Sequence, residues 1–151
     1  MAKEISYEDI KVGDTVFEFI SDPITRTHLA RYAGASGDFN PLHHDETFVA
    51  VFGMPRVIVQ GMLVMGITGR AITDWVAQKH LRAFKVRFAG MTEPVDFNQM
   101  EATKNRATLK VIGRAARKFV EGEEKRIECE IETTDVDGAV KLTGSFIVAF
   151  P

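Results

Sequence analysis

Residues 61–76 read GMLVMGITGRAITDWV, a stretch that is apolar on nearly every side for three helical turns. This pattern is typical of a helix that is surrounded by protein rather than one that lies on a surface. Arg70 and Asp74 mark the point where the helix emerges from its surroundings. We therefore predict a long buried helix over about residues 61–77, around which the rest of the chain is organised.

The hydrophobic period changes from 3.6 to 2 after this helix. Phe84, Val86 and Phe88 alternate with basic residues, and apolar residues again recur at every second position over 127–132 and 140–150. This period is expected for half-buried strands. Asp137-Gly138 lies between two such segments and favours a tight hairpin. The predicted strands cover residues 84–88, 108–115, 127–132 and 140–150. The polar stretch 92–106 is expected to be a loop.

The N-terminal part of the chain predicts a second helix and a long ordered loop. Thr25 or Thr27 can cap the start of a helix that ends at Gly34. The stretch 35–55 is rich in Gly, Asn, Asp and Pro, which predicts a loop with one helical turn near residues 46–52. One buried helix followed by antiparallel strands predicts an α+β fold in which a curved antiparallel sheet wraps the helix. The free edge of such a sheet favours dimerisation.

Composition excludes several classes of function. The 151 residues suit a single domain over 1–151, and a net charge of -2 without basic runs gives no reason to expect nucleic-acid binding. The lone Cys129 allows neither an internal disulfide nor a multi-cysteine zinc site, and its strand pattern predicts a buried apolar filler. The chain shows neither a signal-peptide pattern nor an apolar run of about 20 residues, so we expect a cytoplasmic protein that does not bind membranes.

Residues 32–45, YAGASGDFNPLHHD, carry the residues best suited to chemistry. Asp38 and His43 can meet around one water molecule if the chain between them turns back, and Asn40-Pro41 favours such a turn. Taken singly, Asp38 could instead be an Asx-turn residue and His43 a hydrogen-bonded, partly buried histidine. Adjacent His43, His44 and Asp45 point in different directions, so we predict no metal site.

This stretch resembles the signature of the MaoC-like (R)-specific enoyl-CoA hydratase and 3-hydroxyacyl dehydratase family. The family's Gly-Asp-x-Asn-Pro-x-His pattern is matched at Gly37, Asp38, Asn40, Pro41 and His43, and its His-Gly-Met helix start corresponds to Gln60, Gly61 and Met62. The chain departs from the pattern at Gln60, where the family usually has histidine, and at Gly69, where some members carry serine. The resemblance implies a single hot-dog domain.

The resemblance also implies a reaction, the reversible hydration of trans-2-enoyl thioesters to (3R)-3-hydroxyacyl thioesters in fatty-acid metabolism. Asp38 and His43 would activate water, the Gly61 amide would bind the thioester oxygen, and Asn40 would either touch the substrate or brace the loop. The implied partners are an acyl-CoA or acyl carrier protein thioester and a second hot-dog chain, identical or related, with no cofactor.

Two alternatives to this reaction stay open. One is a hot-dog thioesterase, which is disfavoured because Thr68, Gly69 and Arg70 occupy the middle of the helix, where thioesterases place an acidic residue. The other is a non-catalytic acyl-binding subunit of a heteromeric dehydratase.

Several basic side chains could either be solvated or attract the phosphates of the carrier: Arg82, Lys85, Arg87, Arg114, Arg117 and Lys118.

Overall fold

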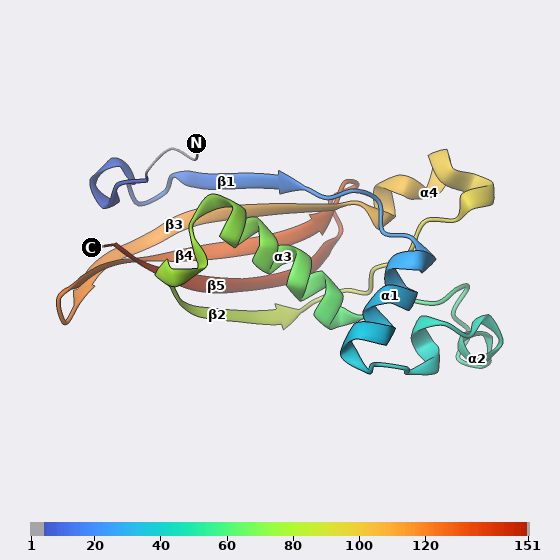
Figure 1. Cartoon of the computed structure of the whole chain (residues 1–151). Helices are drawn as coiled ribbons and strands as arrows, with labels where there is room; N and C mark the ends of the chain where they lie inside the picture. The colour runs from blue at the N-terminus through green and yellow to red at the C-terminus, as the bar shows by residue number, and fades with distance from the viewer. Residues whose placement is uncertain (1–4, 151) are drawn as a thin grey trace.

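The computed structural model describes residues 5–150. A five-stranded antiparallel sheet in the order β1-β3-β4-β5-β2 forms its centre, and α3 lies across one face of this sheet (Figure 1). The strands are β1 (Thr15–Ile20), β2 (Leu81–Phe88), β3 (Leu109–Glu121), β4 (Glu124–Asp135) and β5 (Val140–Phe150). The helices are α1 (Arg26–Ser36), α2 (Glu46–Val51), α3 (Gly61–Trp75) and α4 (Met100–Ala107). The predicted α+β architecture, a curved sheet around a central helix, is confirmed.

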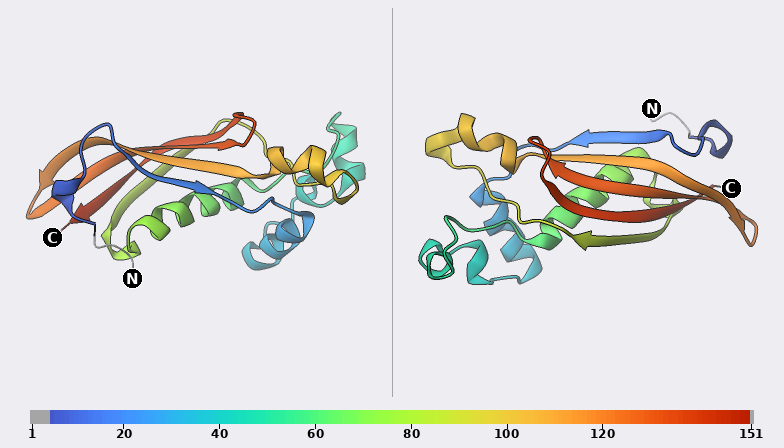
Figure 2. Two further views of the ribbon diagram at one scale, coloured as in Figure 1. Left: turned by 90° about the horizontal axis from the view of Figure 1, so that it is seen from above. Right: turned by 180° about the vertical axis from the view of Figure 1, so that it is seen from behind.

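The central helix α3 buries one face against the sheet. Val64, Thr68, Ala71 and Ile72 recur at helical spacing and are buried, and the Thr68 hydroxyl lies 2.8 Å from the hydroxyl of Thr133 on β4. The opposite face is open in the single chain: Met62, for example, is 54% exposed. Met62 is exposed because the curved sheet covers only one side of the helix, as Figure 2 shows. The expectation of a helix surrounded by protein is therefore met on one side only.

The later strands follow the predicted alternation. Ile127, Cys129 and Ile131 of β4 are buried, whereas the glutamates between them lie on the opposite face of the sheet. Gly122 and Gly138 adopt positive φ angles of 62° and 94° in the two hairpin turns, which only glycine adopts without strain. Cys129 is fully buried, and burial raises the pKa of its thiol to about 12. It is the apolar filler that its strand pattern predicted.

Two local expectations are wrong, and one strand was missed. Strand β1 was not predicted, because it is a short edge strand whose residues are only partly buried. The segment that was expected to be a loop contains α4, which buries only Thr103 and Ala107 and so shows no apolar stripe. Helix α1 does begin after the Thr25 cap, but it runs past the predicted stop and ends at Gly37, where φ is 76°.

The segment between β1 and α3 packs around the first turns of the central helix. Helices α1 and α2 both lie near the end of α3 that begins at Gly61 (Figure 1). A hydrophobic cluster joins Leu29 of α1, Val49 of α2 and Val64 of α3 with Val57 and Val59 of the connecting segment. This cluster fixes the loop that carries the sequence motif against the start of α3. Within residues 5–150, no helix is long and apolar enough to cross a membrane.

Candidate active site

The motif loop turns back on itself between α1 and α2. The left-handed Gly37 ends α1, and the Asp38 carboxylate then accepts a hydrogen bond from the Asn40 amide at 3.3 Å. The Asn40 side chain accepts one from the Leu42 amide at 3.1 Å, which caps a 3-10 turn, η2 (Pro41–His43). The turn expected from Asn40-Pro41 is thus present, and it brings Asp38 and His43 to the same side of the loop.

Asp38 and His43 face each other. The distance from His43 Nε2 to Asp38 Oδ2 is 3.6 Å, and the His43 side chain is 11% exposed while that of Asp38 is 40% exposed. The other ring nitrogen, Nδ1, lies 2.8 Å from the carbonyl oxygen of Ile58. Because a carbonyl oxygen only accepts, Nδ1 carries a proton, and Nε2 is the ring nitrogen that is directed towards Asp38.

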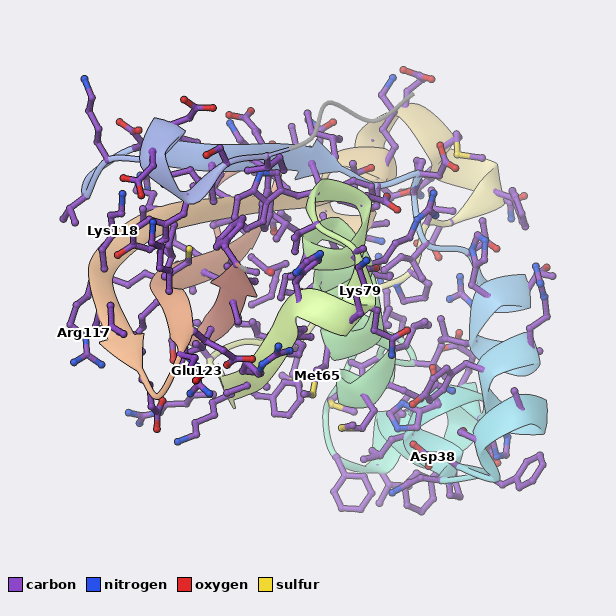
Figure 3. All side chains as sticks on the ribbon, turned by 60° about the vertical axis from the view of Figure 1, so that its left-hand side comes forward. Asp38, Met65, Lys79, Arg117, Lys118 and Glu123 are labelled. Carbon is purple, nitrogen blue, oxygen red and sulfur yellow. The ribbon has the colours of Figure 1, made fainter. Side chains whose placement is uncertain are left out.

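Asp38 lies between α1 and the first residues of α3 in Figure 3. Both sequence-level alternatives describe part of what is observed. Asp38 does take part in an Asx turn, and His43 is hydrogen-bonded and partly buried. Neither interaction uses the Asp38 oxygen and the His43 nitrogen that face each other, so these two atoms are available for chemistry.

The start of α3 supplies a backbone donor. Gly61 is the first residue of the helix and Gln60 is its N-cap, with no side-chain capping bond, so the first amides have no partner within the helix. The helix dipole adds partial positive charge at this point. An added Cβ on Gly61 would lie 3.3 Å from the Phe88 ring, so glycine leaves the amide accessible beside that ring.

One cavity of about 380 Å³ joins His43 to Gly61. Its remaining lining comes from the segment before α3, α3 itself, the end of β2, the segment after β2 and β5: Ile58, Val59, Val64, Phe88, Ala89, Gly90, Met91, Thr92 and Lys141. Asp38 is not part of this lining, but its Oδ2 lies 3.6 Å from Nε2 of His43, which is. The cavity is the feature that unites the imidazole with the amide expected to bind an oxyanion.

Two polar lining residues were not singled out in the sequence. Lys141 is buried, donates to the Met91 carbonyl at 3.0 Å and pairs with Asp135 at 3.1 Å. Thr92 is 2% exposed, and its hydroxyl has no hydrogen-bond partner in the described part of the chain. Lys141 resembles any polar residue of an alternating strand, and Thr92 lies in a segment without periodicity. No signal in the sequence therefore marked either residue as buried.

The two departures from the family pattern have different surroundings. Gln60 is fully buried; its amide nitrogen donates to the Leu29 carbonyl at 3.0 Å, and its Oε1 has no partner among residues 5–150. Gln60 and His43 both line a second cavity of about 280 Å³ beside α1. Gly69 lies against the Phe84 ring, and an added Cβ at this glycine would be 3.4 Å from that ring. Gln60 therefore anchors the helix start to α1 without any titratable group.

Asn40 and the six basic residues named in the sequence analysis do not line the 380 Å³ cavity. Asn40 is exposed and its side-chain oxygen braces the loop. Arg82 pairs with Glu124 at 2.6 Å and Arg117 with Glu128 at 2.8 Å, so these two cations already have anionic partners. In the described residues, no group of three or more His, Cys, Asp or Glu is arranged to hold a metal ion.

Known proteins are similar to this chain in sequence and in fold. The family model for the MaoC-like domain matches residues 10–128. Enoyl-CoA hydratase ChsH3 of Mycobacterium tuberculosis is 41% identical over 61 residues, which cover 38% of this chain and 21% of that protein. The chain thus spans about a fifth of the length of this curated relative, and its match covers 16% of peroxisomal enoyl-CoA hydratase 2 of Arabidopsis thaliana.

Two solved structures share the fold. The (R)-hydratase from A. caviae involved in PHA biosynthesis superimposes with a TM-score of 0.75 at 20% identity, covering 95% of this chain and 99% of that chain. The ChsH1-ChsH2 complex from Mycobacterium tuberculosis gives a TM-score of 0.71 at 18% identity, covering 93% of this chain and 98% of that chain. At these identities the likeness concerns the fold.

Proposed function

Because this chain belongs to the MaoC-like domain family, we propose that it reversibly adds water to trans-2-enoyl thioesters and yields (3R)-3-hydroxyacyl thioesters. The acyl group is carried on coenzyme A or an acyl carrier protein, and the reaction belongs to fatty-acid metabolism. The observation that carries this proposal is the single cavity lined by His43 and Gly61, with Asp38 3.6 Å from the imidazole. The names of the hydratase relatives agree with it.

The geometry suits each step of the reaction. His43 Nε2 and the Asp38 carboxylate together hold a substrate water and take its proton as the oxygen attacks the β-carbon. Charge then develops on the thioester oxygen, where the Gly61 amide and the start of α3 stabilise the enolate. The proton taken from the water, or one exchanged with it, returns through the same pair to the α-carbon, so that one C–O and one C–H bond replace the second bond of the alkene. Asn40 braces the loop that holds this pair.

Hydration of crotonyl-CoA, followed by the loss of the absorbance of the conjugated thioester, tests the proposal. Asp38→Asn and His43→Ala should each lower kcat by about 10²–10⁴-fold, the range for loss of a general acid or base. Far-UV circular dichroism would verify that both variants fold. Release of free coenzyme A thiol by the wild type would instead indicate a thioesterase, and a wild type inactive in both assays would indicate an acyl-binding subunit.

We further propose that the chain acts as a dimer with an identical or a related hot-dog chain. Two observations support this: β2 is an edge strand without a second neighbour in the sheet, and Met62 on the open side of α3 is exposed. A single-layer sheet with one open helix face leaves apolar surface that a partner would cover. The similar ChsH1-ChsH2 structure is a complex of two different chains.

A further inference from the structure

The orientation of His43 depends on a segment that has no helix or strand. The His43 ring is held by the Ile58 carbonyl at 2.8 Å, and the Ile58 amide in turn donates to the Leu42 carbonyl at 3.0 Å. Residues 54–60 form neither a helix nor a strand. The position of Ile58 therefore decides which ring nitrogen of His43 is protonated and where the other one points.

Glu46 fixes this segment one residue before Ile58. Its Oε2 accepts a hydrogen bond from the amide of Val57 at 3.1 Å, and Val57 is 2% exposed. A buried amide that loses its acceptor is unfavourable, so the segment would shift to find another partner. Glu46 is the first residue of α2 and follows the motif loop directly, and it thus links the motif loop to the segment that holds the imidazole.

Arg26 holds the Glu46 carboxylate in place. Its Nε and Nη2 donate to Glu46 Oε1 at 3.1 and 2.6 Å, and its Nη1 donates to Asp96 at 2.8 Å. Partial desolvation lowers the pKa of Arg26, but the bonds to Glu46 and Asp96 together raise it by more, so the guanidinium stays charged. Asp96 also binds Arg56 at 3.0 Å. The segment before Ile58 is thus held at two successive residues by one network of ion pairs.

From these contacts we infer that Glu46 is a positioning residue for His43: it holds Val57 so that the Ile58 carbonyl keeps the imidazole in its Nδ1–H form, with Nε2 directed towards Asp38. The inference rests on the proposed function for its catalytic consequence, but the state of the ring is independent of any substrate. Glu46 borders the smaller cavity beside α1 but does not line the 380 Å³ cavity that contains Gly61, so its effect passes through Val57, Ile58 and His43.

The test compares Glu46→Ala, Glu46→Asp and Glu46→Gln. Glutamine keeps an oxygen of the same reach for the Val57 amide, whereas aspartate keeps the charge but is too short to reach both Val57 and Arg26. In ¹⁵N NMR spectra of the imidazole, we expect His43 to stay in the Nδ1–H form in the wild type and Glu46→Gln. The alanine and aspartate variants should show a mixture of tautomers.

For crotonyl-CoA hydration, alanine and aspartate should lower kcat about 10- to 100-fold, as for a misplaced catalytic group, with KM changed by less than about threefold. Glutamine should restore most of kcat. The matched control is Glu124→Ala, because Arg82 donates to Glu124 Oε1 at the same two distances, 3.1 and 2.6 Å, in a pair outside the candidate site. This control should leave both the tautomer and kcat unchanged.

A wild-type tautomer and kcat in Glu46→Ala would overturn the inference, and so would the same result in Glu46→Asp if the alanine variant does not fold. Should the wild type fail to hydrate crotonyl-CoA while the tautomer still changes in these variants, the positioning role would stand and the proposed reaction would fall. The two ideas are therefore tested separately.

Discussion

Two hydrogen bonds within the motif loop, residues 37–45, join residues that are close in sequence. The hydrogen bond of the His43 imidazole joins residues that are distant in sequence. Asp38 and Asn40 each accept a bond from an amide two residues later, and such bonds form in any chain that carries this local pattern. His43 instead depends on Ile58, which lies fifteen residues away. Each residue of the candidate pair is thus placed by a different kind of contact.

The Gly61 amide can be removed without removing a side chain. Proline at this position deletes the N–H and suits the first position of a helix. We expect Gly61→Pro to fold and to lower kcat for crotonyl-CoA hydration by about 10²–10³-fold, the usual effect of losing one oxyanion donor. Gly61→Ala keeps the amide and adds a Cβ 3.3 Å from the Phe88 ring, so it controls for added bulk. An equal loss of kcat in both variants would contradict the assignment.

Strands β2 and β5 approach each other more closely than a side chain allows. A Cβ on Gly144 would lie 2.0 Å from the Lys85 carbonyl oxygen and 2.9 Å from the Val86 Cα atom. Both atoms belong to the backbone of β2 and cannot rotate away. Gly144→Ala should therefore lower the free energy of unfolding by about 1–3 kcal/mol, as measured by urea denaturation. The control Gly34→Ala, at an exposed glycine where a Cβ would meet nothing within 4 Å, should show no such loss.

Glu124 at the start of β4 connects two strands that are not neighbours. Hydrogen bonds from Arg82 of β2 and from Arg126 lower its pKa from 4.5 to about 2, although β5 lies between β2 and β4 in the sheet. A lowered pKa in the folded state stabilises the protein above the unfolded pKa, near 4.5, and this contribution is lost as the pH falls towards 2.

Urea unfolding of the wild type and Glu124→Gln should reveal this dependence. The wild type should be the more stable at neutral pH, and the difference should shrink as the pH falls below about 4.5, where the unfolded carboxyl becomes protonated. Because the pair is exposed to solvent, added salt should also reduce the difference. A difference that is constant from neutral pH to about pH 2.5 would argue against this ion pair.

The molecule as a whole has one sheet, one helix across it and, in the described residues, no second layer over the helix. Light scattering at micromolar concentration should therefore give twice the chain mass of 16.8 kDa, because a partner would cover β2 and the open face of α3. A stable monomer would contradict a homodimer. Activity that appears only when a second hot-dog chain is added would indicate a heterodimer instead.

The sequence alone predicted the elements whose pattern is periodic. The helix over residues 61–76, the alternation in β2, β4 and β5 and the glycine turn at 138 are local signals, and the structure has each of them. The motif also predicted that Asp38 and His43 approach each other, because the turn between them is made by Asn40 and Pro41. Edge strand β1 and helix α4 were not predicted, since partial burial removes the period on which such predictions depend.

Only the tertiary structure decided what surrounds the imidazole. The Ile58 carbonyl and the Glu46–Arg26 pair are brought together by the packing of α1, α2 and the connecting segment on the start of α3. The buried Lys141 and Thr92 reach the same cavity from β5 and from the segment after β2. Local propensity depends on neighbours in the chain, whereas burial and hydrogen-bond partners depend on which segments share a core. The candidate residues Asp38 and His43 were therefore visible in the sequence, and their orientation was determined by the fold.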